Sequence, residues 1–356
     1  MHLLTLTRYE RLGSSSRVRF YQYFPYLEAQ GFEIVNAPFF SDEYVKSLYA
    51  GQAISRSKVL RAYVKRLLTL ANSARFDLLW IEKELFPWMP AWFEGLLHLF
   101  KIPYVVDYDD AVYHRYDMHP SPLVRGLLGR KIDRVMQNAA QVIVGNAYLA
   151  ERAKRAGAKR VETLPSVVDV PQYEFRHGPP SSSGVKIGWV GSPITAPYLG
   201  GIRKAVGQLA SEVPVELVLI GTGNTDPFPG LPTRLLPWDE KMELSIGRMF
   251  DVGIMPLVDG PFERGKCGYK LIQYMAAGLP VVASPVGVNN QLIVPGENGF
   301  LADSPREWLD AFRELANKPA LQLKMGQSGR RLAEQMYNLQ VTAPRLFQLL
   351  SSVRRV

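Results

Sequence analysis

Two lysines lie where a diphosphate could bind. Lys266 stands in a loop that contains two glycines, and Lys270 stands near the start of an expected helix that Gly278 ends. Because the first N–H groups of a helix have no partner within it, a helix start favours an anion. Together the two lysines make a plausible diphosphate site. The alternative is that both are simply solvated.

Three carboxylates, those of Asp107, Asp109 and Asp110, crowd the end of an expected buried strand. If they are desolvated, the pKa of at least one of them should rise. Asp109 or Asp110 could accept a hydrogen bond from a hydroxyl group of a ligand. Two alternatives stay open: Asp107 and Asp109 could form a metal-binding pair, or the carboxylates could cap the next segment.

The loop after the first expected strand could bind a ligand. Gly13 allows a close backbone approach, Ser14 can donate a hydrogen bond, and Arg17 adds positive charge. The loop matches neither a Walker motif nor a dinucleotide fingerprint, so it does not indicate ATP or dinucleotide binding. A plain helix cap is the alternative.

Two glutamates and a histidine could bind a hydroxyl group of a ligand. Glu82 and Glu84 follow another expected strand, and His114 lies near the acidic cluster. Carboxylates above a strand end can accept hydrogen bonds from a hydroxyl group. For these residues no metal-ligand spacing is convincing.

The elements that position these residues alternate between short apolar runs and longer amphipathic stretches, a pattern typical of parallel sheets crossed by helices. Strands are predicted near 2–7, 33–37, 77–82, 103–107, 141–145, 160–163, 185–190, 215–220, 251–255, 279–283 and 298–301. Helices are predicted at 17–30, 57–73, 90–100, 122–138, 147–156, 199–211, 239–249, 268–278, 304–317, 320–335 and 341–353.

Proline, glycine and serine interrupt both periodicities between Val170 and Gly184. We therefore predict an α/β protein with two tandem Rossmann-like, doubly wound domains that face a cleft. The expected divisions are a first domain at 1–168, a linker at 169–184, a second domain at 185–340 and a C-terminal helix within 341–356. That helix could pack on either domain.

The amino-acid composition indicates an ordinary globular protein. Of 356 residues, 47% are hydrophobic and 21% charged, which is ordinary for a globular protein. The single cysteine, Cys267, cannot form an internal disulfide, so a reducing cytoplasm fits best. The first residues lack the pattern of a signal peptide, and the longest uncharged run, 271–296, contains three prolines. We expect a cytoplasmic protein without a transmembrane segment.

The net charge of +9 comes mainly from the first half of the chain. No acidic residue occurs between Glu43 and Asp77, where a basic stripe runs beside an apolar one. Such a helix indicates contact with an anionic membrane surface, an anionic partner such as nucleic acid, or only a solvated face. The expected membrane-surface residues are Arg56, Lys58, Arg61, Lys65 and Arg66.

The segment from Asp251 to Ser284 resembles the donor-site block of retaining glycosyltransferases with the GT-B fold, family four of the sequence classification. In that family a strand ending in proline precedes a loop and a helix that reads roughly Glu-Ala-Met-Ala-x-Gly-x-Pro-Val-Val. Here Gln273-Tyr-Met-Ala-Ala-Gly-Leu-Pro-Val-Val282 stands there. The resemblance continues through 283–287 and 296–299 and, more loosely, through the whole chain.

Departures from the family pattern indicate a divergent branch. Many members carry two glutamates seven residues apart, the second of which binds the donor ribose. Gln273 stands at that second position, and Glu263 lies two residues from the first. The family's usual arginine and lysine after strand 185–190 are also missing. Asp109 falls where many members have the histidine of a His-Asp pair. The expected donor-binding residues are Gly13, Ser14, Arg17, Gly191, Ser192, Thr195, Glu263, Tyr269 and Gln273.

The resemblance implies a hexosyltransferase that moves a sugar from a nucleotide diphosphate sugar to a hydroxyl of a lipid-linked or polysaccharide acceptor. The domain at 1–168 is then the acceptor side and the domain at 185–340 the donor domain. The expected catalytic residues are Lys266 and Lys270, which stabilise charge on the departing diphosphate, and Asp109 and Asp110, which orient the sugar or the acceptor hydroxyl. The expected acceptor-binding residues are Glu82, Glu84 and His114.

The resemblance also implies retention of configuration, no metal and no cofactor beyond the donor, and a place in polysaccharide or lipopolysaccharide biosynthesis, peripheral on the inner face of the membrane. A nucleotide-sugar epimerase of GT-B fold and a basic-surface nucleic-acid-binding protein are the alternatives, although we expect no nucleic acid.

Overall fold

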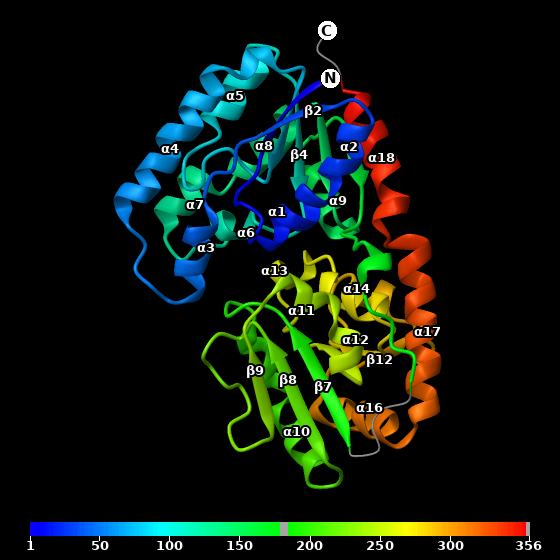
Figure 1. Ribbon diagram of the computed structural model, residues 1–356. Helices are drawn as coiled ribbons and strands as arrows, with labels where there is room; N and C mark the ends of the chain where they lie inside the picture. Colours follow the sequence, from blue (N-terminus) through cyan, green and yellow to red (C-terminus); the bar gives the residue numbers. More distant parts are fainter. Residues whose placement is uncertain (179–183, 354–356) are drawn as a thin grey trace. The chain divides into compact units, whose positions relative to one another are not determined.

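The computed structural model describes residues 1–178 and 184–353, and the chain divides into two compact units. Unit 1 comprises Met1–Ser166, Arg264–Cys267 and the segment from Leu339, while unit 2 comprises Val167–Glu263 and Gly268–Asn338. Residues 179–183 of the expected linker lie outside the described residues. Each unit contains one six-stranded sheet whose strands are all parallel (Figure 1). The expected α/β fold with two parallel sheets is thereby confirmed.

The sheet of unit 1 has the strand order β2-β1-β3-β4-β5-β6. All five residues of β3 and all five of β4 are buried. Such continuous burial is typical of parallel strands that helices cover on both faces. The strands of unit 1 are β1 (His2–Leu6), β2 (Glu33–Asn36), β3 (Leu78–Glu82), β4 (Tyr104–Tyr108), β5 (Gln141–Val144) and β6 (Val161–Thr163).

The helices of unit 1 include one that comes from the far end of the described chain. The hydroxyl groups of Tyr23 and Thr342 lie 3.1 Å apart, and the rings of Phe32 and Phe347 meet edge to face. These contacts attach α18 (Leu339–Ser351) to the N-terminal unit. The other α-helices are α1 (Ser14–Arg19), α2 (Phe24–Ala29), α3 (Asp42–Tyr49), α4 (Arg56–Ala71), α5 (Trp92–Leu99), α6 (His114–Asp117), α7 (Pro122–Leu128), α8 (Lys131–Asn138) and α9 (Ala147–Arg155).

The sheet of unit 2 has the order β12-β11-β10-β7-β8-β9 and separates two cores. Leu217 and Leu219 of β8 join one apolar cluster, while Val218 and Ile220 join the other. This alternation follows from the two-residue period of a strand. The strands of unit 2 are β7 (Val185–Val190), β8 (Val215–Ile220), β9 (Thr233–Leu236), β10 (Val252–Met255), β11 (Val281–Ala283) and β12 (Gly299–Leu301).

Helices α10 and α16 pack together on one side of this sheet, and α14 and α17 pack together on the other. Helix α16 begins with a capping box, in which Ser304 and Glu307 satisfy each other's backbone N–H groups. The α-helices of unit 2 are α10 (Arg203–Ala210), α11 (Glu240–Leu244), α12 (Ile246–Met249), α14 (Tyr269–Ala276), α15 (Asn289–Leu292), α16 (Pro305–Asn317) and α17 (Pro319–Met336). Helix α13 (Pro261–Arg264) ends at the first residue of the 264–267 segment of unit 1.

Each sheet reverses its strand order at one point. In unit 1 the chain leaves β1 toward β2 and returns to β3 on the other side, and in unit 2 it leaves β7 toward β8 and returns to β10. Ligands of open parallel sheets bind at the carboxyl ends of the strands beside such a switch point. A ligand-binding site is therefore expected at the loops after β1, β3, β7 and β10.

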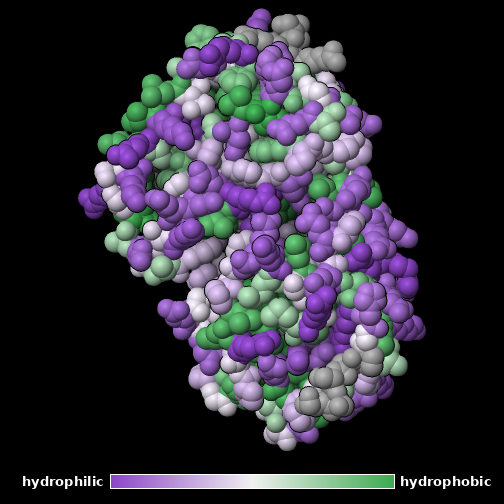
Figure 2. All heavy atoms as spheres, viewed as in Figure 1, coloured by the Kyte–Doolittle hydropathy of each residue, from purple (hydrophilic) through white to green (hydrophobic). Residues whose placement is uncertain are grey.

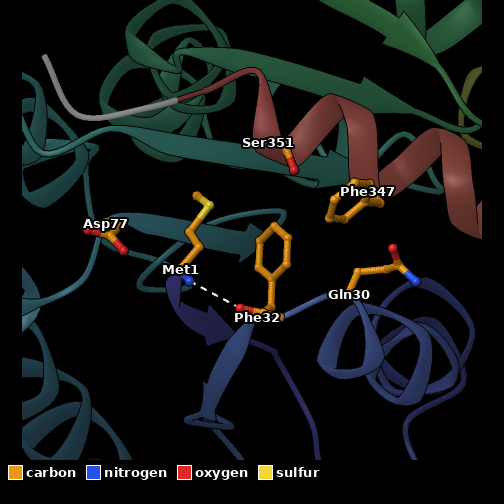
Figure 3. A pocket seen from close by; sticks show the side chains of 7 residues that line it. Met1, Gln30, Phe32, Asp77, Phe347 and Ser351 are labelled. Atoms are coloured by element: carbon orange, nitrogen blue, oxygen red, sulfur yellow. Dashed lines mark hydrogen bonds between the residues drawn. The ribbon is translucent and has the colours of Figure 1, made fainter.

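A pocket of about 400 Å³ lies elsewhere, at the amino-terminal ends of β1 and β3 in unit 1 (Figure 3). It is lined by Met1, Gln30, Gly31, Phe32, Asp77, Phe347 and Ser351. None of the site residues expected from the sequence lines it. We assign it no role. Within the described residues, none of the helices combines the length and the apolar character that crossing a bilayer requires.

Candidate active-site residues

Lys270 contacts the loop that follows β7, as a shared ligand site would require. Its ammonium nitrogen lies 3.4 Å from the hydroxyl oxygen of Thr195 and 4.9 Å from the ring centre of Trp189. Lys270 is the second residue of α14, and Gly268 precedes that helix with a left-handed φ of 66°. The structure thus brings the positive charge, a helix start and the switch-point loop together within unit 2.

Gly191 and Ser192 form the turn that presents Thr195. The backbone N–H of Ser192 donates to Thr195 Oγ1 at 3.2 Å, and that hydroxyl donates to the Ser192 carbonyl at 3.1 Å. A Cβ atom on Gly191 would lie 2.2 Å from the Trp189 ring, so only glycine fits there. Close packing on Trp189 is therefore one reason for this glycine.

Glu263 accepts a hydrogen bond from the hydroxyl of Tyr198. Tyr198 belongs to the 3-10 helix Ala196–Ile202 that follows the β7 loop. Burial, together with the neighbouring Glu263 carboxylate, raises the pKa of Tyr198. Glu263 therefore lies next to the same loop as Lys270, although its own bond is to a protein hydroxyl.

Gln273 points into the interior of unit 2. The side chain is only 2% exposed, and its amide nitrogen donates to the Tyr173 hydroxyl at 3.2 Å. That hydroxyl in turn donates to Glu243 at 3.3 Å. The residue that stands at the family's ribose-binding position is thus part of a buried hydrogen-bond network.

Glu243, on α11, is the centre of this network, although it is not among the site residues expected from the sequence. Trp238 donates its indole N–H to one carboxylate oxygen at 2.7 Å, and the hydroxyl of Tyr269 lies 3.4 Å from the other. Glu243 is 4% exposed. Its role depends on Tyr173 and Tyr269, which are far away in sequence, so no local pattern could reveal it. The Glu243 carboxylate thus links Tyr269 to Tyr173, and through Tyr173 to Gln273.

Lys266 lies in the short segment of unit 1 that interrupts unit 2 in sequence. The side-chain amide of Asn146 donates to the carbonyl oxygens of Gly265 and Lys266 at 2.9 and 3.1 Å. The thiol of Cys267 donates to the Asp109 carbonyl at 3.1 Å. The backbone beside Lys266 is therefore fixed on the loops after β4 and β5. Lys266 belongs to unit 1 and Lys270 to unit 2.

Glu82 anchors the loop after β1. One of its carboxylate oxygens accepts from the Ser16 hydroxyl at 2.6 Å and from the Arg8 backbone N–H at 2.7 Å. Burial raises the pKa of Glu82, which is 2% exposed. Its observed bonds are therefore to the protein itself, and they hold the loop that carries Gly13 and Ser14.

Gly13 sits so close to Tyr9 that a Cβ atom would lie 2.4 Å from the Tyr9 Cβ. Ser14 begins α1 and is exposed, whereas Arg17 on the same helix is 7% exposed. Of the three expected residues in this loop, Ser14 is accessible and Arg17 is largely enclosed. Gly13 has a packing reason of its own.

The three carboxylates at the end of β4 pair with two different cations. Asp107 forms a two-pronged ion pair with Arg19, at 2.8 and 3.1 Å. Asp109 and Asp110 instead meet the ammonium group of Lys83, at 2.9 and 2.8 Å. Although burial disfavours the charge on Asp109, attraction to Lys83 lowers its pKa.

Lys83 is a second residue of the candidate site that is not among those expected from the sequence. Its backbone has φ of 64°, a conformation that costs a lysine about 1–3 kcal/mol. The ammonium group also donates to the Ser15 hydroxyl at 3.2 Å, so it joins the start of α1 to the loops after β3 and β4. The run Glu82-Lys83-Glu84 at a strand end was the available signal. Lys83 orders the two carboxylates that we expected to act in catalysis.

Glu84 is enclosed by donors. Arg8 and Lys131 pair with its carboxylate, and the Tyr116 hydroxyl donates to it at 2.8 Å. Burial opposes its charge, but Lys131 and Arg8 together lower the pKa of Glu84. Its side chain is 1% exposed. Glu84 therefore stabilises a buried charge network in unit 1.

His114 is held between an acid and a phenol. Its Nδ1 lies 2.8 Å from Asp117, and its Nε2 lies 3.1 Å from the Tyr148 hydroxyl. Arg152 pairs with the other oxygen of Asp117 at 2.9 Å. Among residues 1–178 and 184–353, no cluster of three His, Cys, Asp or Glu side chains could hold a metal ion.

One residue of the expected membrane surface is not on the surface. Arg66 is 3% exposed, and its guanidinium donates to the carbonyls of Thr7 and Ala37 at 2.9 and 3.0 Å. The periodicity of α4 turns this position inward, whereas Arg56, Lys58, Arg61 and Lys65 are exposed. The basic face therefore contains four of the five expected cations.

Comparisons with known proteins find similarity to glycosyltransferases in part of the sequence and in the fold. Residues 186–318 match the family model for glycosyl transferases group 1. A D-inositol 3-phosphate glycosyltransferase of Pseudarthrobacter chlorophenolicus is 35% identical over 83 residues. That match covers 23% of this chain and 19% of the relative, so the aligned part is about a fifth of the curated protein's length.

Solved structures match almost the whole chain. Sucrose-phosphate synthase from Thermosynechococcus elongatus superimposes with a TM-score of 0.74 at 17% identity, covering 99% of this chain and 98% of that one. Anabaena HepE in complex with UDP gives 0.71 at 15% identity, covering 99% and 100%. The fold is that of the GT-B glycosyltransferases.

Proposed function

We propose that this protein is a retaining glycosyltransferase that transfers a hexose from a UDP-sugar to a hydroxyl group of a lipid-linked or polysaccharide acceptor. The observation that carries the proposal is the contact of Lys270 with Thr195 at 3.4 Å, at the start of α14 and beside the switch point of unit 2. A lysine ammonium at a helix start suits a diphosphate. The group 1 domain match and the UDP and UDP-glucose complexes of Anabaena HepE support this choice of donor.

In the proposed reaction, the bond between the anomeric carbon and the phosphate oxygen breaks while the acceptor oxygen bonds to the same face of the sugar. The acceptor proton passes to the departing diphosphate. Lys270 stabilises the charge that develops on that diphosphate, and Thr195 and the N–H of Ser192 lie beside it. Unit 1 supplies the acceptor side, where Asp109 and Asp110 orient hydroxyl groups. No metal is required in this scheme.

The proposed location is the cytoplasm, at the inner face of a membrane that carries the acceptor. A buried free thiol at Cys267 suits a reducing compartment. The exposed cations of α4 suit an anionic bilayer. This location belongs with polysaccharide or lipopolysaccharide biosynthesis.

A ligand titration followed by thermal unfolding tests the donor site. UDP, GDP, ADP, CMP and dTDP are each added with and without EDTA, because a ligand that binds the native state raises its midpoint. We expect UDP to stabilise the protein equally in both conditions and to lose that effect in Lys270→Ala. Stabilisation that EDTA abolishes would contradict metal independence, and no stabilisation by any diphosphate would contradict the donor site. Product formed from the donor alone would indicate an epimerase.

A further inference from the structure

Unit 1 exposes an unusual number of large apolar side chains in one part of its sequence. Of twenty such side chains among the described residues, fourteen lie between Leu48 and Leu127. Helix α5 and its end expose Trp92, Leu96, Leu99 and Phe100, of which Leu99 is 70% exposed. Scattered exposed apolar residues are normal, but a concentration of them marks an interaction surface.

The helices that carry these side chains share one inner core. The ring of Phe86 packs on Tyr63 of α4 at 5.8 Å and on Phe93 of α5 at 4.6 Å. Because their inner faces meet at Phe86, the outer faces of α4 and α5 are neighbours. Figure 1 draws the two helices side by side, and Figure 2 shows hydrophobic atoms emerging among hydrophilic ones in that region.

Helix α7 adjoins the same surface. Trp88, which is 48% exposed, meets His119 edge to face at 5.7 Å. The His119 carbonyl accepts from Arg125 of α7. Leu123 and Leu127 of that helix are 77% and 71% exposed. We call the outer surface of α4, α5 and α7 the three-helix face.

The charges on this face are all positive. Helix α4 exposes Arg56, Lys58, Arg61 and Lys65 and contains no acidic residue, and α7 contains none either. The only acid of α5, Glu94, is 1% exposed and accepts from the Leu85 N–H. Lys58 pairs with Glu43 at 3.7 Å, and because both side chains are exposed this pair offsets little charge.

We propose that the three-helix face binds an anionic lipid bilayer, with the apolar side chains of α5 and α7 entering the headgroup region and the cations of α4 contacting lipid phosphates. Exposed tryptophan beside leucine and lysine is the composition of interfacial helices. Such a bilayer would also hold a lipid-linked acceptor, and only this link to the acceptor rests on the proposed function.

Charge decides between a bilayer and a second copy of this chain. In a two-fold dimer the same patch meets itself, so the α4 cations would face one another without an acid to pair with. An anionic membrane supplies the opposite charge instead. The face is thus complementary to a lipid surface and not to itself.

Co-sedimentation of the full chain with vesicles tests the proposal without any sugar donor. We expect binding to phosphatidylcholine vesicles that contain 30% phosphatidylglycerol and at least ~10-fold weaker binding to phosphatidylcholine alone. A charge variant (R56Q, K58Q, R61Q, K65Q) should lose at least ~100-fold in partitioning, and an apolar variant (W92S, L96S, L99S) at least ~10-fold. A control variant on unit 2 (V258S, V294S, M336S), which changes equally exposed residues, should bind normally.

Fluorescence gives a measurement on the unaltered protein. Brominated lipid in the same vesicles should quench tryptophan emission, and W92F should reduce that quenching. No binding to anionic vesicles, or unchanged binding by the apolar variant, would overturn the proposal. So would a dimer in solution that the apolar variant converts to a monomer. Because no nucleotide is present, these results are separate from the outcome of the UDP titration.

Discussion

The side-chain amide of Gln273 donates to the Tyr173 hydroxyl at 3.2 Å, and both side chains are enclosed in unit 2. In the family that the sequence resembles, a glutamate at this position binds the donor ribose. Here the position belongs to a buried network that ends on Glu243. The glutamine therefore has a structural reason that is independent of any ligand.

Restoring the glutamate should not restore a family contact. In Gln273→Glu the new carboxylate cannot donate to Tyr173 and is buried near the Glu243 charge. We expect unit 2 to lose about 2–4 kcal/mol in its free energy of unfolding, measured by urea titration. The exposed Gln291→Glu serves as the control. A variant of unchanged stability that binds UDP more tightly would refute this account.

Glu243 should be essential for the stability of unit 2. In Glu243→Ala the Trp238 indole N–H and the neighbouring phenols lose their acceptor, which should cost about 2–4 kcal/mol. Urea unfolding followed by tryptophan emission measures this, because Trp238 itself reports on the network. The exposed Glu297→Ala should change stability by less than about 0.5 kcal/mol. Equal effects of the two substitutions would contradict the network.

Lys270 should matter for turnover more than for folding. We expect Lys270→Ala to lower kcat by at least ~100-fold, comparable to the loss of one oxyanion donor. A sugar-transfer assay measures this, with an unchanged unfolding midpoint as evidence of a native fold. Lys324→Ala, on the exposed side of α17, should retain full activity. Near-normal turnover in Lys270→Ala would remove Lys270 from the mechanism.

Stability should depend on pH through Lys83 and Asp109. Because the pKa of Asp109 is lower in the folded chain than the ordinary value near ~3.9, its charge stabilises unit 1 above about pH 4. That contribution disappears as the pH falls through the folded pKa. Lys83→Met should therefore lower stability most at pH 6–7, and the difference from the unaltered protein should shrink below about pH 4.

Urea midpoints between pH 3 and pH 7 measure this difference. Lys154→Met, an exposed lysine of α9, is the matched control. A deficit in Lys83→Met that stays constant over this range would show that the ion pair with Asp109 is not its cause.

The buried β-strands could be predicted from the sequence, and so could the exposed edge strands β2 and β6, but one edge strand could not. The run Val185–Val190 has the predicted bounds because branched and apolar residues fill a strand covered on both faces. Strand β9 is absent from the predicted strands. Its four residues, Thr233–Leu236, form the edge of the sheet and are all partly or fully exposed. Their sequence, Thr-Arg-Leu-Leu, has neither a run of branched apolar residues nor an alternation of apolar and polar residues.

Helix breaks were also hard to predict. The stretch 17–30 was expected to be one helix, but it forms α1, a 3-10 turn and α2. The backbone leaves the helical region at Phe20, and Pro25, in the first turn of α2, suits a helix start. Amphipathic periodicity continues across this break, so periodicity alone could not locate it.

Residue type indicated where polar groups gather, but not which of them pair. Asp109 and Asp110 were selected as carboxylates at a strand end, and the structure has them there. Their partner Lys83 was not selected, because an ion pair between two loops depends on sheet order. Glu82 and Glu84 were expected to bind an acceptor. In the structure Glu84 is enclosed by donors from the protein, while one oxygen of Glu82 accepts from Ser16 and Arg8 and the other has no hydrogen-bond partner among the described residues. Tertiary partners of this kind leave no local pattern.

Helix α18 determines the order in which the two units can be completed during synthesis. Its buried residues, including Leu346 and Leu350, complete unit 1, yet the ribosome reaches them only after all of unit 2. Unit 2 can therefore finish folding first. Until α18 is made, the surface around Tyr23 and Phe32 that it covers stays exposed. In the nascent chain, the N-terminal unit is therefore the last to be completed.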